Sequence, residues 1–348
     1  MNSDKTILNV GLPKGSLNQK GRGETWKLLS EAQYDIQGYE PGNEDARSLA
    51  IANDLELGLY LIRPQSIGLE MNDYRLIDVA IMGRDWAEEW KLTGRELELL
   101  ANLGYGNARV VLATDGKIAS CFDRAPTLED IFQTCNPVRG FTELPRITER
   151  YLMQSQEYVS RFGRKKPSVY FRAGMIQRVR KPLDEVQLIV SEGLTESNLL
   201  KNVASFVVDV TQTGRTLEEN GAVILDTILE TEAGLYASPR INKLPSARRK
   251  AEEFRDMLVS AVDARRRQFY TMNLPAENLP AFAEWAIGEG YCAKTPSVMM
   301  YGENASVNVL VKKSQIPAFL AGLKKYNATD VVSLDTSQVF ALSKGDGK

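Results

Sequence analysis

The sequence predicts an α/β protein whose carboxyl-terminal part is a smaller sheet module of a different kind. Through the first two thirds of the chain, short apolar runs alternate with segments of helical periodicity, which is the pattern of α/β folds. A long charged helix, expected over residues 246–268, ends this region. Beyond it, the order changes to strand, helix, strand, strand, helix, strand.

Each strand expected in the α/β region is a short apolar run bounded by a glycine, a proline or polar residues. These strands are residues 7–12, 57–62, 78–82, 109–114, 186–190, 205–210 and 234–238. Helices are expected through residues 26–32, 67–71 and 145–154. A further helix is expected from Leu217 onward, because apolar residues then recur at helical spacing. These residues are Ile224, Leu225, Ile228 and Leu229.

The carboxyl-terminal module has expected strands at residues 269–274, 297–301, 306–312 and 329–334, and expected helices at 279–287 and 316–326. This order is the split βαβ pattern of ferredoxin-like domains. Such modules often sense small molecules, although a fold alone does not establish a function. The long helix before the module has an inner side formed by Phe254, Leu258, Ala261 and Val262.

The composition indicates a large core and no general attraction to polyanions. Of the 348 residues, 43% are hydrophobic and 25% are charged, so we expect two or three domains. The net charge of −2 argues against nucleic acid or membrane partners, and no apolar stretch could span a bilayer. Cys121, Cys135 and Cys292 are too few and too dispersed for a disulfide framework, so we expect a cytoplasmic protein.

The chain contains no histidine. This absence excludes a Ser-His-Asp triad, a Cys-His dyad and a histidine-ligated metal. The remaining chemical groups are carboxylates, lysine and arginine side chains, backbone amides, and a hard cation bound by oxygen. Phosphoryl or phosphoribosyl transfer fits this inventory, because positioning and charge stabilisation supply most of the catalysis.

The loop after residues 205–210 combines an acid, hydroxyls and a glycine between an expected strand and an expected helix. Free backbone N–H groups at such a helix start favour an anion. Asp209 would bind sugar hydroxyls or a phosphate-bound cation, so the loop indicates a phosphorylated sugar. The alternative is an ordinary capped helix, since Thr216 and Glu219 form a T-x-x-E capping box. That alternative accounts for Thr216 but leaves Asp209, Thr211 and Thr213 unexplained.

Other polar turns follow expected strands at residues 13–16 (PKGS), 83–85 (GRD) and 191–197 (SEGLTES). Each has a glycine where a ligand could approach the backbone. The first turn lacks the spacing of a Walker A loop.

Five segments, in order, resemble motifs of the ATP phosphoribosyltransferase family in its long form, the first enzyme of histidine biosynthesis. They are residues 12–17 (LPKGSL), 62–64 (IRP), 77–85 (IDVAIMGRD), 193–196 (GLTE) and 209–217 (DVTQTGRTL). Together they cover most of residues 7–240. The carboxyl-terminal module matches the family's regulatory domain in its placement.

The resemblance implies a reaction that joins N1 of ATP to C1 of the ribose of phosphoribosyl pyrophosphate and releases pyrophosphate. The implied catalytic residues are Lys14, Arg63 and Glu196, of which Lys14 and Arg63 would neutralise phosphates. The residues that would hold the ribose and its 5-phosphate are Asp209, Thr211, Thr213, Gly214, Arg215 and Thr216. The rest of the cleft would be lined by Gly15, Gly83, Asp85 and Gly193.

The resemblance also implies Mg²⁺ as the cofactor, bound mainly through substrate phosphates, with Asp209 as a candidate ligand from the protein. It implies a two-lobed core like that of periplasmic binding proteins. Residues 1–113 with 232–268 would form lobe I, residues 114–231 lobe II, and residues 269–348 the ferredoxin-like regulatory domain. The implied partners are ATP, phosphoribosyl pyrophosphate, histidine as an inhibitor, and further copies of the chain in a dimer or hexamer.

Some residues depart from the family pattern. Ser205 stands where members often have an acid, Gln65 and Ser66 stand near an expected aspartate, and residues 162–187 form a longer segment. These departures leave open a phosphoribosyltransferase that acts on another nucleobase. A solute-binding protein and a non-catalytic homologue are further alternatives, since both share a cleft between two α/β lobes. Release of pyrophosphate from ATP and phosphoribosyl pyrophosphate would separate these alternatives.

Overall fold

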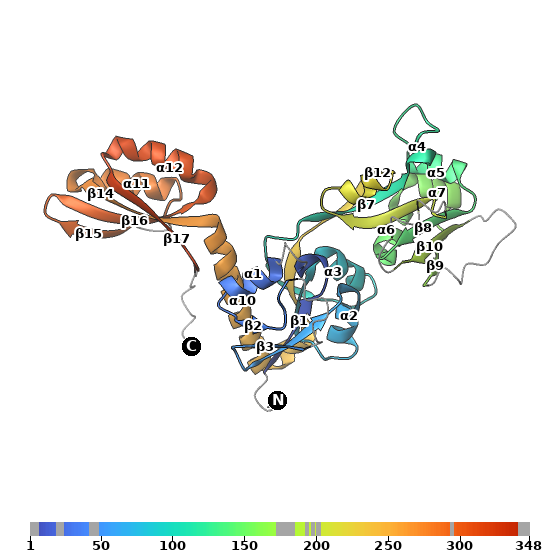
Figure 1. Ribbon diagram of the computed structural model, residues 1–348, viewed down its shortest axis with the longest axis horizontal. Helices are drawn as coiled ribbons and strands as arrows, with labels where there is room; N and C mark the ends of the chain where they lie inside the picture. The colour runs from blue at the N-terminus through green and yellow to red at the C-terminus, as the bar shows by residue number, and fades with distance from the viewer. Residues whose placement is uncertain are drawn as a thin grey trace. The chain divides into compact units, whose positions relative to one another are not determined.

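The computed structural model describes residues 7–18, 24–41, 49–171, 185–191, 195, 199, 203–292 and 296–339. In this part of the chain the strands form three sheets (Figure 1). Two compact units are present, Met1–Thr25 with Gln37–Ala251, and Trp26–Ile36 with Glu252–Lys348. No helix in the described ranges combines the length and apolar character needed to span a membrane.

The first sheet is built around β1, whose side chains are almost entirely buried. In spatial order its strands are β2 (Ile36–Gln37), β3 (Leu49–Ala52), β4 (Leu57–Ile62), β1 (Leu8–Pro13), β5 (Val79–Gly83), β13 (Ala233–Ala237) and β6 (Glu98–Asn102). β4 and β5 run parallel to β1, while β13 runs antiparallel to β5 and β6. The helices that follow β1, β4 and β5 in the sequence are α1 (Glu24–Glu31), α2 (Pro64–Asn72) and α3 (Arg84–Lys91). A central strand buried on both faces reads as a continuous apolar run, which explains why β1 and β5 were predictable.

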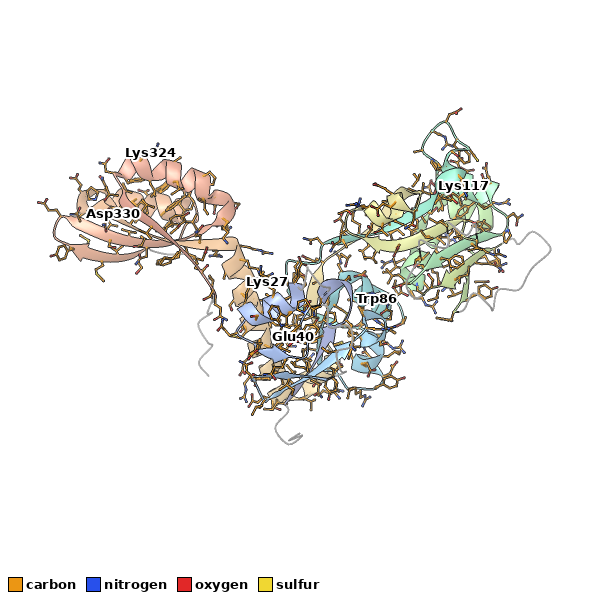
Figure 2. The ribbon with its side chains drawn as sticks, in the orientation of Figure 1. Lys27, Glu40, Trp86, Lys117, Lys324 and Asp330 are labelled. Carbon is orange, nitrogen blue, oxygen red and sulfur yellow. The ribbon has the colours of Figure 1, made fainter. Side chains whose placement is uncertain are left out.

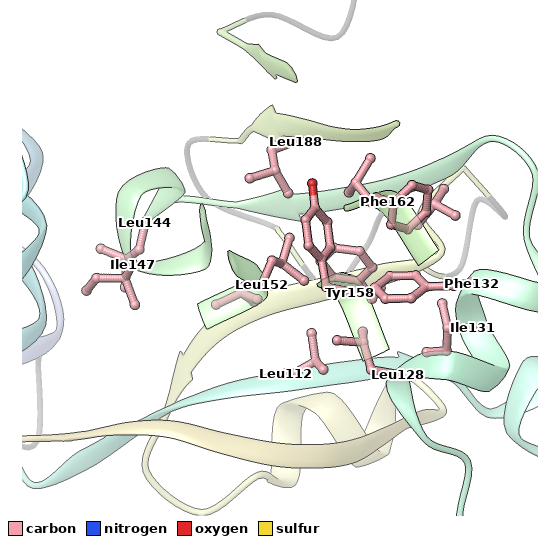
Figure 3. Close-up of a cluster of buried hydrophobic side chains, with 14 of the residues drawn as sticks. Leu112, Leu128, Ile131, Phe132, Leu144, Ile147, Leu152, Tyr158, Phe162 and Leu188 are labelled. Atoms are coloured by element: carbon pink, nitrogen blue, oxygen red, sulfur yellow. The ribbon is translucent and has the colours of Figure 1, made fainter. Parts of the chain in front are cut away.

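The second sheet is mixed. In spatial order its strands are β12 (Ala222–Thr231), β7 (Ala108–Asp115), β11 (Phe206–Thr211), β8 (Val138–Thr142), β10 (Val186–Val190) and β9 (Ser168–Tyr170). Its helices are α4 (Gly116–Ala119), α5 (Leu128–Thr134), α6 (Pro145–Gln154), α7 (Gln156–Phe162) and α9 (Arg215–Glu219). A core on one face joins Leu112 and Leu188 of the strands to Phe132, Leu152 and Tyr158 of the helices (Figure 3).

Strand β8 was not expected from the sequence. Its residues, VRGFT, include Arg139 and Gly140, which are unusual in a buried strand. A Cβ atom on Gly140 would overlap the ring of Phe206 on β11. The glycine is therefore required by packing against a neighbouring strand, and this requirement cannot be read from the local pattern.

The helix expected from Leu217 through Leu229 is wrong. Helix α9 ends at Glu219, and the chain continues as strand β12. The pairing of β12 with β7 shifts register twice, after Ile224 and after Thr227. A β-bulge inserts a residue into the two-residue alternation, so the apolar residues of β12 imitate helical spacing.

The chain passes between the first two sheets at two places. It leaves the first sheet between Asn102 and Ala108, because β7 already belongs to the second sheet. This crossing lies ahead of residue 113, where the sequence placed the end of the first lobe. The chain returns at Glu232, between β12 and β13.

The carboxyl-terminal module has the expected ferredoxin-like topology. After α10 (Pro245–Arg266), the elements are β14 (Arg267–Pro275), α11 (Leu279–Gly288), β15 (Ser297–Tyr301), β16 (Asn304–Lys312), α12 (Ile316–Leu323) and β17 (Thr329–Asp335). The spatial order β15-β16-β14-β17 is antiparallel throughout, which confirms the split βαβ prediction. Both helices cover one face of the sheet (Figure 1), and Phe282 and Phe319 bury their side chains there. On α10, the side chains of Phe254 and Leu258 are fully buried, which confirms its inner side.

Candidate active site at the strand ends

Cationic residues follow the parallel strands of the first sheet. In the parallel pairing of β1 with β4, Pro13 lies opposite Ile62, so Lys14 and Arg63 are the next residues along neighbouring strands. Arg84 follows β5, which is also parallel to β1. The carboxyl ends of parallel strands meet at one edge of a sheet, which is where open α/β sheets bind ligands. The fold thus places three cationic residues at a single edge.

Gly15 shapes the turn that follows β1. Its φ of +104° lies in a region that residues with side chains rarely adopt. No heavy atom lies within 4 Å of the position that a Cβ would take, and the residue is exposed. Asn18 closes the turn by donating its backbone N–H to the carbonyl of Gly15 at 2.9 Å. The backbone beside Lys14 is therefore open to solvent.

Gly83 and Asp85 support the crossing between the sheets. The hydroxyl of Thr231, at the end of β12, donates to Asp85 Oδ1 at 2.7 Å and accepts the Asp85 N–H at 3.1 Å. A Cβ on Gly83 would overlap the same carboxylate, so the glycine makes room for it. Burial raises the pKa of Asp85, although the bond from Thr231 opposes the shift. Asp85 thus lies beneath the surface and fastens β12 to the start of α3.

Polar residues follow the parallel strands of the second sheet. Strand β8 lies between β11 and β10, with Thr142 aligned to Val208 on one side and to Val190 on the other. The next residues along these three strands are Asp209, Glu143 and Ser191. Two carboxylates and a hydroxyl therefore share one edge, in contrast to the cations of the first sheet.

The loop after β11 is held in shape by its own hydroxyls. Thr211 Oγ1 accepts the backbone N–H of Gly214 at 2.9 Å, and Thr213 Oγ1 accepts that of Arg215 at 3.3 Å. Gly214 has a φ of +82°, and a Cβ there would come within 3.1 Å of Ile224 Cδ1. Both the conformation and the space favour glycine. The loop is thus ordered by short internal hydrogen bonds next to Asp209.

The capping box expected from Thr216 and Glu219 is wrong. Helix α9 begins at Arg215, its N-cap is Gly214, and no side chain caps it. Glu219 instead accepts a hydrogen bond from Arg215 Nε at 2.6 Å, and both side chains are largely exposed. Thr216 is also exposed. Because α9 has only five residues, its dipole is weaker than that of the long helix expected here.

Two predicted residues, Gly193 and Glu196, lie outside the described residues. Between them, Thr195 is described and buried, and its hydroxyl is 2.9 Å from that of Ser191. This bond ties the segment to the end of β10.

The structure adds two residues to the site: Gln65, which was noted in the sequence only as a departure from the family pattern, and Glu143, which sequence reasoning missed. Gln65 Nε2, in the first turn of α2, donates to Glu143 Oε2 at 3.2 Å. Gln65 lies two residues after Arg63, and Glu143 directly follows β8. This bond joins the strand-end region of one sheet to that of the other. Identification of β8 in the sequence would have pointed to Glu143.

The described residues fit a cation that is bound mainly by its substrate. Within them, no group of three or more cysteine, aspartate and glutamate side chains could hold a metal ion. Glu143 directly follows β8, and Asp209 lies two residues before the end of the neighbouring strand β11, so the two residues supply carboxylates from adjacent strands. Mg²⁺ usually keeps waters and takes one or two carboxylates together with substrate phosphates, so this arrangement suits it.

Comparison with known proteins identifies the family. A model of the family described as HisG, ATP phosphoribosyltransferase, matches residues 63–260. The ATP phosphoribosyltransferase of Pelotomaculum thermopropionicum is 25% identical over 345 residues, which cover 95% of this chain and 99% of that protein. That of Solibacter usitatus is 26% identical over 341 residues, with 96% and 99% covered.

The fold is similar to a solved ATP phosphoribosyl transferase (HisG:HisZ) complex from Thermotoga maritima. The TM-score is 0.50 at 19% identity, and the match covers 74% of this chain and 98% of that one. The family model spans more than half of the sequence and includes the strand ends after β4, β5 and β11. The chain therefore belongs to the ATP phosphoribosyltransferase family.

Proposed function

We propose that the two strand-end edges hold the substrates of the family's reaction. In that reaction, the 5-phosphoribosyl group moves from phosphoribosyl pyrophosphate to N1 of ATP, and pyrophosphate is released. It is the first step of histidine biosynthesis, and the chain is accordingly a glycosyltransferase. The observation that carries the site assignment is the parallel register, which pairs Pro13 with Ile62 and Val208 with Thr142. The next residues along these strands are Lys14 and Arg63 in the first sheet, and Asp209 and Glu143 in the second.

The loop from Asp209 to Thr216 would bind the ribose and its 5-phosphate. Its backbone N–H groups and hydroxyls are donors for phosphate oxygens, and the carboxylate of Asp209 is an acceptor for ribose hydroxyls. The internal bonds of Thr211 and Thr213 hold the loop before the ligand arrives. A preorganised loop loses less conformational freedom on binding.

Lys14 and Arg63 would stabilise the negative charge of the leaving group, pyrophosphate. The bond from C1 to the pyrophosphate oxygen breaks while the bond from C1 to N1 of ATP forms. Negative charge then collects on pyrophosphate, where fixed cations stabilise it. When bound, Mg²⁺ supplies further neutralisation of these phosphates, with Asp209 and Glu143 as the protein groups that would reach it.

The absence of histidine agrees with this chemistry. N1 of adenine already presents a lone pair at neutral pH, so its attack on C1 requires no general base. Holding the two reactants in line supplies much of the rate.

Incubation of the purified chain with ATP, Mg²⁺ and phosphoribosyl pyrophosphate tests the proposal. Release of pyrophosphate together with a phosphoribosylated ATP product supports it. Release only with another nucleobase would assign the chain to a different phosphoribosyltransferase. Binding without turnover would indicate a non-catalytic homologue.

We also propose that free histidine inhibits the enzyme through the carboxyl-terminal module. The ferredoxin-like topology, placed after α10, supports this regulation. Inhibition requires a coupling free energy between two sites, typically about 1–3 kcal/mol. Titration of the intact enzyme with histidine at millimolar-range concentrations measures it. If neither turnover nor binding calorimetry responds, the module senses another ligand or is structural.

We further propose that the module joins copies of the chain into a homo-oligomer. On the sheet face opposite α11 and α12, register places Met299 beside Ser306, and Leu334 beside Phe269. Met299 is 73% exposed and Leu334 53% exposed. Exposed apolar side chains on edge strands are typical of interaction surfaces.

Sedimentation of the intact protein tests the assembly. Met299→Lys should lower the molecular mass, because a lysine there would be buried without a partner in the interface. Leu320→Lys is the matched control, since Leu320 is 42% exposed on α12, on the other side of the module. A monomeric parent would refute the assembly.

A further inference from the structure

A buried glutamate on one sheet's helix caps a helix of the other sheet. Glu89 lies on α3, and its side chain is 5% exposed. Its Oε1 accepts the backbone N–H of Arg146 at 2.8 Å, and its Oε2 accepts that of Ile147 at 2.9 Å. These N–H groups belong to the first turn of α6, whose own N-cap residue, Leu144, makes no side-chain cap. Glu89 thus satisfies donors that a helix start leaves unpaired.

Neighbouring contacts join the same elements. The side chain of Trp86 on α3, labelled in Figure 2, packs against the core clusters of both sheets. Arg150 of α6 lies 3.5 Å from Glu88 of α3, and Gln65 of α2 donates to Glu143. The start of α6 is therefore held against α2 and α3 at several points.

The contact between Glu89 and α6 lies close in the sequence to the strand ends that are proposed to hold the substrates. Strand β8 ends at Thr142, and α6 begins at Pro145. Only Glu143 and Leu144 separate the strand end from the helix that Glu89 caps. On the other side, α3 begins directly after Gly83 at the end of β5. A displacement of the α6 start would move Glu143 relative to Asp209 and to the cations of the first sheet.

We propose that Glu89 is a positioning residue of the phosphoribosyl transfer, which sets the place of the β8 strand end relative to the first sheet by capping α6. This inference rests on the substrate site proposed above. Glu89 would touch no substrate and would act through α6.

The charge state of Glu89 gives the proposal a distinctive pH dependence. Burial raises the pKa of Glu89 to about 7, although the N–H groups of Arg146 and Ile147 and the charges of Arg146 and Arg150 oppose the shift. The ionisable and charged residues on α3 and on the elements packed against it are Arg84, Asp85, Glu88, Lys91, Glu70, Arg146, Glu149, Arg150, Tyr151, Asp226, Glu230 and Tyr236. Burial thus disfavours the ionised carboxylate by more than the two N–H groups and the nearby arginines favour it, so the packing of α3 against α6 loses stability as pH rises through about 7.

The experiment compares Glu89→Gln, Glu89→Ala and Glu96→Gln in the full chain. Gln is permanently neutral and keeps one acceptor, so it imitates the protonated residue. Ala removes the cap. Glu96 is exposed after α3, and its replacement controls for the loss of one carboxylate. For each variant, kcat and KM for both substrates are measured from pH 6 to pH 8.5, together with phosphoribosyl pyrophosphate affinity and thermal unfolding.

Glu89→Ala should lower kcat/KM by roughly tenfold, the equivalent of a lost cap with charged hydrogen bonds. Glu89→Gln should match the parent near pH 6. Above pH 7, its kcat/KM relative to the parent should rise by about three- to tenfold. Glu96→Gln should follow the parent at every pH.

If Glu89 has a purely structural role, its substitution will change thermal unfolding, but the pH profile of Glu89→Gln will stay parallel to that of the parent. That result would overturn the inference. Full activity of Glu89→Ala would overturn it as well. If the parent itself fails to bind phosphoribosyl pyrophosphate, the substrate site is wrong. If the parent binds and turns over while the profiles stay parallel, only the role of Glu89 is wrong.

Discussion

Gly140→Ala tests how tightly β8 is packed beneath the substrate edge. The added methyl group would overlap the ring of Phe206 and would lie 3.0 Å from Leu188 Cδ2. Phe206 and Leu188 are both fully buried, so neither side chain can swing into solvent. Forcing extra volume into a packed core costs about 1–3 kcal/mol. We expect a loss near the upper end, about 2–3 kcal/mol, because two buried neighbours must move together.

Urea unfolding followed by circular dichroism measures this loss, and hydrogen exchange of the β8 and β11 amides locates it. Phosphoribosyl pyrophosphate affinity should also fall, because Phe206 lies on the strand that carries the Asp209 loop. In a double-mutant cycle, Phe206→Leu should relieve part of the Gly140→Ala effect, with a coupling of at least about 1 kcal/mol. Gly288→Ala is the matched control, since no heavy atom lies within 4 Å of the corresponding position in α11. That change should be neutral or stabilise by up to about 1 kcal/mol. If Gly140→Ala costs less than about 0.5 kcal/mol, the packing argument for β8 is refuted.

Asp209→Ala and Thr213→Val should each weaken phosphoribosyl pyrophosphate binding by roughly ten- to hundredfold, because each removes a polar group worth about 1.5–3 kcal/mol. Calorimetry that shows normal affinity in both variants would refute the loop assignment. The parent should lose about 2–3 kcal/mol of stability between pH 5 and pH 8 through Glu89, since the contribution of a carboxyl with a raised pKa is present below about 4.5 and is lost as pH rises through about 7. This slope should disappear in urea unfolding of Glu89→Gln, and an unchanged slope would contradict the burial argument. Removal of Mg²⁺ with a chelator should abolish turnover without unfolding the chain, whereas loss of the circular dichroism spectrum would indicate a structural metal.

The local sequence pattern was sufficient to predict a strand or helix where the element is defined by its own residues. β4, β10 and β15 begin and end as the sequence predicted, because apolar runs and their polar or proline boundaries are local features. The ferredoxin-like module was predictable for the same reason. Its two central strands, β14 and β16, alternate buried and partly buried residues over most of their length.

Local pattern failed where pairing between strands altered the periodicity. The bulges of β12 arise from its register with β7, and Gly140 belongs in β8 only because Phe206 packs over it. Neither condition is visible in a window of neighbouring residues.

For the site, the sequence by itself determined which chemical groups are available. The lack of histidine, the polar turns after Leu12 and Val210, and the family motifs around Arg63 and Gly214 are all properties of the chain as written. They were sufficient to indicate a phosphorylated sugar and the family.

Only the tertiary structure decided which of these groups share an edge and which serve the scaffold. Parallel register aligned Lys14 with Arg63 and added Glu143 beside Asp209, while burial assigned Asp85 to the crossing between sheets. In the sequence, nothing distinguishes Glu89 from the other glutamates of its charged helix. Only the fold places the start of α6 against its side chain. The physical reason is that hydrogen-bond partners and desolvation depend on residues far away in the chain, which no local pattern specifies.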